Sequence, residues 1–245
     1  YSFTVPQYFR MAHSTAGVYA LWTENTSAPT KIRYATLLSH NANPSDPTSL
    51  GGHVSGAYTQ DSTPTLTFTL SDPDSGDTVK YRIQIDDSSD FSSAAVDYTS
   101  SLASQGSASF TVGQAAGSGS YTTGSSGQSL SDGSFYWRVK TIDDDAAESS
   151  YTTANSGNAA FIVDATAPTT PGTPSTTSAV TDTTPTWTWT ASTDGGSGLA
   201  ATPYTLQWSQ ASDFSSGVST TTATTNSFTH STALSDGTWY FRVKA

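Results

Sequence analysis

Hydrophobic and polar residues alternate strictly in several short stretches of the chain. Leu66, Phe68 and Leu70 alternate with threonines, and segments 81–85 and 135–139 place Tyr, Ile, Phe, Trp or Val at every second position. A period of two sends successive side chains to opposite faces of a strand. Each stretch is therefore predicted to be a β-strand whose apolar face packs between two antiparallel sheets.

Three sequence blocks occur twice, in the same order. They are DSTPTLTFTLS at 61–71 and DTTPTWTWTAS at 182–192, YRIQIDDSSDFSS at 81–93 and YTLQWSQASDFSS at 204–216, and SDGSFYWRVK at 131–140 and SDGTWYFRVK at 235–244. The repetition predicts two copies of one domain. The first copy is longer between its second and third blocks, and its Gly/Ser-rich segment 113–128 is predicted to be a long surface loop.

The composition narrows both fold and function. About a third of the residues are Ser or Thr, and the chain has only two Glu and four Lys, which disfavours helices. The absence of Cys excludes disulfides, zinc–thiolate sites and Cys nucleophiles. A net charge of -11 argues against nucleic acid as a partner, and no apolar run is long enough to predict a membrane span. The low-charge, Ser/Thr/Asp/Gly-rich composition favours an extracellular or cell-surface location in a prokaryote.

The order of the repeated blocks, followed by the strand Ala160–Asp164 and the linker Ala165–Pro171, resembles the fibronectin type III-like and bacterial immunoglobulin-like repeats of large secreted surface proteins. The resemblance implies an all-β fold of tandem antiparallel β-sandwiches. We assign residues 58–165 to the first sandwich and 166–245 to the second. The second copy lacks a last strand at Ala245, so the sequence is expected to be an excerpt of a longer polypeptide.

Residues 1–57 differ in composition from the repeats and contain none of the three repeated blocks. The alternation in GVYALWTEN and KIRYATLLS predicts a β-hairpin, and residues 1–40 resemble one blade of a sialidase-type β-propeller, although the Asp-box motif is absent. The resemblance implies that the chain begins in the last blade of a propeller. Residues 41–57 are predicted to be a linker into the first sandwich. Asn25 lies in an Asn-Thr-Ser sequon and is a candidate N-glycan site.

Aspartate is the unusual residue, with 18 of the 20 acidic positions. Short carboxylates on loops suit Ca²⁺, which takes six to eight oxygen ligands. The candidate calcium ligands are Asp72, Asp74, Asp77, Asp143, Asp144 and Asp145, and Asp86, Asp87 and Asp90 in the DDSSD segment could converge with them. The alternative is that these residues cap turns by accepting hydrogen bonds from backbone N–H groups.

Eight of the nine basic residues form pairs two positions apart, namely Lys31/Arg33, Lys80/Arg82, Arg138/Lys140 and Arg242/Lys244. On a strand, both members of a pair share one face. They form either a glycan-binding or partner-binding stripe with Tyr136 or Tyr240, or a solubilising face paired with acids on adjacent strands. Trp137, Trp187, Trp189 and Trp208 fall on inward positions and are predicted to be core residues.

No catalytic residue is predicted. The four histidines lie in unrelated contexts, and no metalloprotease, nucleophile-elbow or phosphate-loop motif occurs. The leading hypothesis is a non-catalytic structural or adhesive segment of a large secreted protein: a stalk, spacer or filament subunit whose strand edges pair with other copies or neighbouring surface proteins. The alternative is accessory, polysaccharide-binding modules of an extracellular glycoside-active enzyme.

Overall fold

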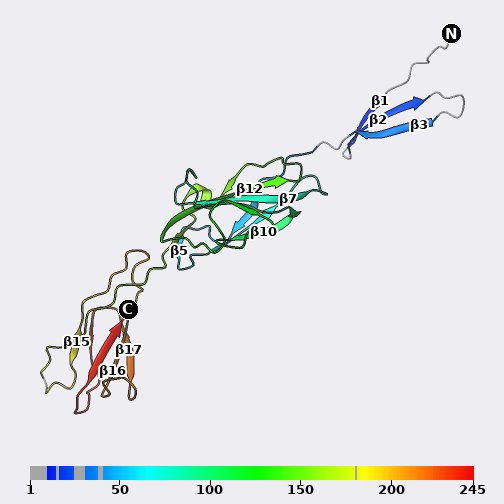
Figure 1. Ribbon diagram of the computed structural model, residues 1–245. Helices are drawn as coiled ribbons and strands as arrows, with labels where there is room; N and C mark the ends of the chain where they lie inside the picture. The colour runs from blue at the N-terminus through cyan, green and yellow to red at the C-terminus, as the bar shows by residue number, and fades with distance from the viewer. Residues whose placement is uncertain (1–9, 15–16, 25–30, 38–40, 180) are drawn as a thin grey trace, which may run out of the picture.

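The computed structural model describes residues 10–14, 17–24, 31–37, 41–179 and 181–245. Almost every element is a β-strand, and nearly all strand pairs are antiparallel, which confirms the all-β prediction. The one helical turn among the described residues is the 3₁₀ turn η1 (Ala154–Gly157). Three β units follow one another along the chain, with the longest sheet in the middle unit (Figure 1).

The N-terminal unit is a three-stranded antiparallel sheet in the order β1-β2-β3. Its strands are β1 (Arg10–Ser14), β2 (Gly17–Glu24) and β3 (Lys31–Leu37). The predicted hairpin corresponds to β2 and β3, and β1 was not foreseen. Asn25 lies outside the described residues, and the resemblance to a propeller blade stays a prediction.

The middle unit is a sandwich of two sheets. The smaller sheet has the order β10-β6-β4 and the larger one β11-β8-β7-β12-β14-β5, with β9 and β13 on its margins. The strands are β4 (Thr48–Gly51), β5 (Ala57–Thr59), β6 (Thr65–Leu70), β7 (Thr78–Asp86), β8 (Val96–Thr99), β9 (Ala103–Ser104), β10 (Gly106–Thr111), β11 (Ser120–Thr123), β12 (Gly133–Asp143), β13 (Thr152–Thr153) and β14 (Phe161–Val163). The pair β14–β5 is parallel, unlike the others.

The predicted alternation locates the core of this sandwich. Leu66 and Phe68 of β6 are buried against Ile83 and Ile85 of β7, and Trp137 of β12 is fully buried among them. The Trp137 indole N–H donates to the carbonyl oxygen of His53 at 2.7 Å, so the largest side chain of the core keeps its hydrogen bond.

The prediction that residues 41–57 form a linker is wrong. β4 pairs with β6, and β5 begins at Ala57 and pairs with β14, so this segment supplies edge strands to both sheets. Leu50 and Val54 pack against the core, and the Thr141 hydroxyl donates to the Ser45 carbonyl at 3.0 Å. The first sandwich therefore begins before residue 58.

The prediction that segment 113–128 is only a surface loop is also wrong. Its residues Ser120–Thr123 form β11, which extends the larger sheet by pairing with β8. Tyr121 packs against the Tyr98 ring with centroids 4.9 Å apart, and its hydroxyl donates to the Gln114 carbonyl at 2.8 Å. One half-buried aromatic ring gives this Gly/Ser-rich segment a fixed position.

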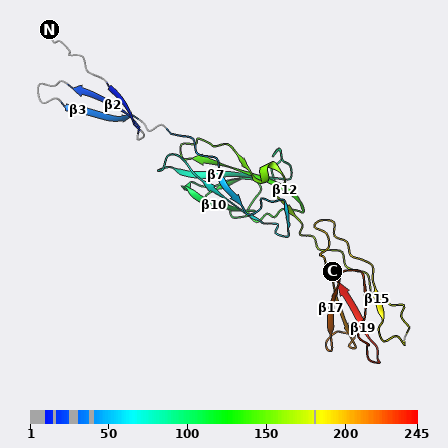
Figure 2. The same ribbon diagram turned by 180° about the vertical axis from the view of Figure 1, so that it is seen from behind.

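The C-terminal unit repeats the arrangement with fewer strands (Figure 2). Its sheets are β15-β18 and β17-β16-β19, formed by β15 (Thr186–Thr188), β16 (Tyr204–Ser209), β17 (Ser219–Ala223), β18 (Ser227–Thr229) and β19 (Tyr240–Lys244). Trp189 is buried as predicted. Trp187 and Trp208 are half-buried and stack on Phe241, with centroids 4.7 Å and 6.4 Å from its ring. The core of this unit is therefore aromatic and less completely covered.

His230 is the counterpart in the second copy of Val112 in the first. Each lies two residues after a Phe, and each donates its backbone N–H to a proline carbonyl oxygen, that of Pro64 for Val112 and that of Pro185 for His230. His230 is 5% exposed, and its Nε2 atom has no hydrogen-bond partner. Burial lowers the pKa of this imidazole below its ordinary value of 6.5. The second copy thus carries a titratable group in its core.

We expect acid to destabilise the C-terminal unit through His230. Because the folded pKa is lowered, the unfolded chain binds a proton more readily, so stability is complete above about pH 6.5 and falls as the pH drops below it. Thermal unfolding between pH 7.5 and 5 should show this loss, and His230→Val should abolish it. An equal pH dependence in both proteins would contradict the assignment.

Candidate functional site

Two groups of predicted calcium ligands lie at the same end of the first sandwich. Asp72, Asp74 and Asp77 occupy the turn between β6 and β7. Asp143 is the last residue of β12, and Asp144 and Asp145 follow it. β12 and β7 are antiparallel, with Asp143 opposite Val79, so the end of one strand lies beside the beginning of the other. The sheet register therefore brings the two groups together.

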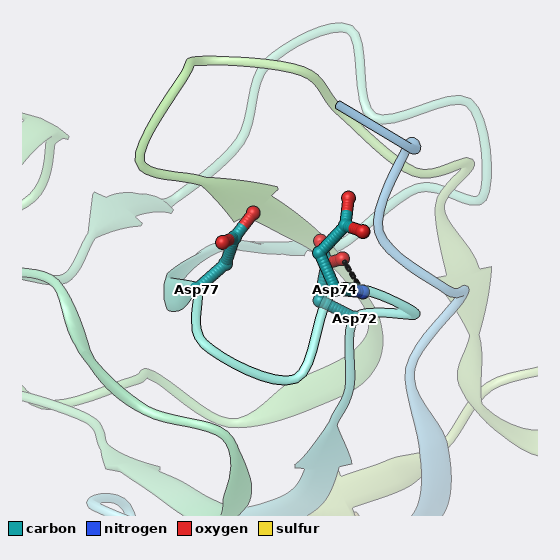
Figure 3. A group of neighbouring side chains, drawn as sticks. All are labelled: Asp72, Asp74 and Asp77. Atoms are coloured by element: carbon teal, nitrogen blue, oxygen red, sulfur yellow. Dashed lines mark hydrogen bonds between the residues drawn. The ribbon is translucent and has the colours of Figure 1, made fainter. Parts of the chain in front are cut away.

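The first group forms a compact cluster of carboxylates. One oxygen each of Asp72, Asp74 and Asp77 lies within 4.8 Å of the others, and the side chains project from one turn of the chain (Figure 3). The Asp72 Oδ1 atom accepts the Asp74 backbone N–H at 2.8 Å. The Asp72 Oδ2 atom is buried and has no hydrogen-bond partner. Burying a carboxylate oxygen without a partner costs free energy, so this atom needs a hydrogen-bond donor or a cation.

Other groups hold the cluster in shape. Gln105 accepts the Asp72 backbone N–H at 2.8 Å and donates to the Asp74 carbonyl oxygen at 2.9 Å. The backbone N–H of Ala42 donates to Asp74 Oδ2 at 2.8 Å. The pKa of Asp77 is raised by loss of solvation and by the negative charges of Asp144, Asp74, Asp72 and Asp145. Five carboxylates thus repel one another at this end of the sandwich.

Asp143 does not join this cluster. Its carboxylate accepts hydrogen bonds from the Asn41 side chain at 2.9 Å and from the Ala147 backbone N–H at 2.7 Å. Asp144 accepts the Thr78 hydroxyl at 3.2 Å. The structure therefore separates the six predicted ligands into three clustered side chains, one carboxylate committed to local hydrogen bonds, and two neighbouring charges.

The segment with Asp86, Asp87 and Asp90 lies at the opposite end of β7. Asp86 is fully buried and accepts the backbone N–H groups of Ser88 and Ser93 at 3.3 and 3.1 Å. Asp90 accepts the Ser92 N–H at 3.0 Å, which lowers its pKa. Here the turn-capping interpretation of the sequence applies.

Arg82 and Lys140 of the first sandwich form ion pairs within it. Arg82 forms an ion pair with Asp97 at 2.6 Å, and Lys140 pairs with Glu148. Burial acts to raise the pKa of Asp97, but hydrogen bonds from Arg82 and Gln84 outweigh it and lower the pKa. These contacts support the pairing interpretation of the basic stripe rather than the ligand-binding one.

Each copy also places an arginine over a phenylalanine ring, a contact that the sequence did not reveal. Arg138 lies 4.2 Å from the Phe91 centroid and 4.3 Å from that of Tyr151, while Arg242 lies 4.2 Å from the Phe214 centroid. In both copies a glutamine accepts from the arginine Nε atom, at 2.8 Å for Gln84 and 2.7 Å for Gln207. The Gln, Phe and Arg that recur in the sequence blocks therefore form the same contact in both copies, with the arginine on the phenylalanine ring and bonded to the glutamine.

Two further aspartates connect the sandwiches, and the sequence analysis missed them. Asp132 accepts the Ala165 backbone N–H at 2.8 Å, and Asp164 accepts the Ser197 N–H at 2.5 Å across the junction. Hydrogen bonds from Thr166 and Ala165 lower the pKa of Asp132, and those from Ser197 lower the pKa of Asp164. The only sequence signal was the position of each Asp beside a predicted turn or linker.

No protein-family model matches the chain, and the comparison with curated proteins finds no match. Among the described residues, no helix has the length and apolar character needed to cross a bilayer.

The two arginine contacts offer a matched pair of variants. Arg138→Ala should lower the free energy of unfolding by about 1–2 kcal/mol, because it removes two ring contacts and a hydrogen bond from a half-enclosed site. Arg242→Ala should cost less, since one ring lies against this more exposed side chain. Urea denaturation of both variants checks the order, and an Arg138→Ala variant as stable as the parent would contradict it.

Proposed function

We propose that residues 41–245 are a non-catalytic structural segment of a large secreted or cell-surface prokaryotic protein, acting as a stalk, spacer or filament subunit. The Ser/Thr-rich, low-charge composition and the tandem repeats support this role. The two sandwiches are proposed to be fibronectin type III-like or immunoglobulin-like modules. The propeller-like segment 1–40 and the glycan at Asn25 stay predictions.

The junction between the sandwiches is the observation that carries the proposal. Asp132, in the turn before β12, holds the linker backbone at Ala165, and Asp164 reaches the backbone of Ser197 in the second sandwich. Asp164 is 5% exposed, so its bond is shielded from water. A spacer needs a restricted angle between its modules, and the bond from Ser197 to Asp164 supports such a restriction while Asp132 holds the start of the linker.

The outer edge of β19 supports assembly by strand pairing. In the first sandwich, the counterpart β12 is covered on this side by β13 and β14, and Phe161 and Val163 of β14 are buried. No described segment pairs with the outer edge of β19, and Phe241 of this strand is only half-buried. We infer that an extended segment with the chemistry of residues 150–164 adds to this edge.

The polysaccharide alternative depended on Tyr136 and Arg138. Arg138 is enclosed between the rings of Phe91 and Tyr151 and bonded to Gln84, so its guanidinium group already has partners. No contact of the described residues favours a sugar site over the structural role.

The junction carboxylates give the first test of the spacer. Asp164→Ala combined with Asp132→Ala should broaden the distance distribution in small-angle scattering while both sandwiches stay folded. The matched control is Asp236→Ala, the counterpart of Asp132 in the second copy. Because both pKa values are lowered, the same broadening should appear in the parent protein as the pH falls below about 3.8. An unchanged distribution in the double variant would rule out a restricted junction.

Strand addition has its own test. A synthetic peptide with the sequence of residues 150–164 should slow amide hydrogen exchange in β19, because it would cover the open edge and place a Tyr near Arg242. The control peptide carries Ser in place of the Phe and Val of β14. Equal effects of the two peptides, or none, would refute specific strand addition.

A further inference from the structure

The buried oxygen of Asp72 is the starting point for a further inference. Asp72 is 8% exposed, and its Oδ2 atom is buried without a hydrogen-bond partner while Oδ1 accepts the Asp74 N–H. Oδ2 belongs to the carboxylate that lies within 4.8 Å of those of Asp74 and Asp77. Figure 3 shows the oxygen outside the dashed bond on the side facing Asp77. A buried carboxylate oxygen in this position needs a hydrogen-bond donor or a cation, and negative charge on both neighbouring aspartates favours a cation.

Among the residues that the structure describes from 41 onward, no basic side chain pairs with these aspartates. The ion pairs among the described residues join Arg82 to Asp97 and Lys140 to Glu148, and neither includes the three aspartates. Asp144 and Asp145 add negative charge beside the three aspartates. Protonation at acidic pH or a bound cation relieves such repulsion, and at neutral pH a cation is the effective means.

We propose that Asp72, Asp74 and Asp77 bind one Ca²⁺ ion. The donor set consists of carboxylate oxygens on one turn, with no His nitrogen or Cys sulfur, which favours a hard cation over zinc or copper. A six-residue turn supplies irregular rather than octahedral geometry, which favours Ca²⁺ over Mg²⁺. Water completes the coordination shell.

The ion also fixes where the chain enters the sandwich. Ala42 donates its backbone N–H to Asp74 Oδ2, and Asn41 donates to Asp143 beside the cluster. Neutralising the repulsion holds Asp74 in the position that binds Ala42. Calcium thus stiffens the chain at Asn41 and Ala42, where it enters the first sandwich, an effect that does not depend on the proposed spacer role.

The test is calorimetric titration of the whole chain with Ca²⁺, and with Mg²⁺ for comparison. We expect one Ca²⁺ per chain with a dissociation constant of about 10⁻⁴–10⁻³ M, as in extracellular calcium modules, and weaker Mg²⁺ binding. Asp72→Asn keeps an acceptor for the Asp74 N–H and should weaken binding at least about tenfold. The matched control Asp87→Asn removes one exposed carboxylate at the opposite end of the sandwich and should bind normally.

Two further readouts separate binding from folding. With chelator, Asp72→Asn should melt at the same or a higher temperature than the parent, because it removes a repelling charge. Calcium at about five times its dissociation constant should raise the parent's Tm by about 4 °C and slow hydrogen exchange at Ala42, and should do neither in the variant. No binding at 5 mM Ca²⁺ would overturn the proposal, and so would equal binding by Asp72→Asn.

Discussion

The antiparallel pairing of β7 with β12 determines where the rest of the first sandwich lies. It aligns eight residue pairs, from Tyr136 opposite Asp86 to Asp143 opposite Val79. On the inner face this register buries Trp137 beside Ile85, and on the outer face it places Arg138 opposite Gln84. The same register carries the end of β12 to the aspartate turn. Core, arginine contact and carboxylate cluster thus follow from one alignment.

Threonine and aspartate replace long charged side chains on the outer surface. Thr65 and Thr111 join their hydroxyls across two strands at 2.8 Å, and Thr186 and Thr229 do the same in the second copy. Seven of the 18 aspartates accept the N–H group two residues further on, as Asp61 does from Thr63. A Glu side chain is one methylene too long for this local bond, which explains the excess of Asp. Asp72 makes such a bond with one oxygen and leaves the other free for a ligand.

Periodicity predicted the strands that alternate cleanly, and repetition predicted two related sandwiches. Periodicity did not predict β4 or β11. Both strands lie in segments without alternating apolar residues, near Gly51 and within the Gly/Ser-rich segment 113–128, and they form by pairing with β6 and β8. The turn Asp72–Asp77 was recognised from its composition. The hydrogen bonds of Asp143 were not, since one comes from Asn41, which lies 102 positions away in the sequence, and the other from Ala147 beyond the end of β12. Sequence periodicity thus shows which face of a strand is buried, but not which carboxylate oxygen already has a partner.

The two ends of the first sandwich use carboxylates in different ways. Where the chain leaves the sandwich, Asp132 and Asp164 accept hydrogen bonds from backbone N–H groups, so the protein itself stabilises these two charges. Where the chain enters, Asp72, Asp74 and Asp77 outnumber their donors, and their repulsion remains. The exit is therefore sensitive mainly to strong acid, which removes the charge. The proposed Ca²⁺ ion would balance the charge at the entry, so the stiffness of this end would follow the ionic surroundings while that of the exit would not.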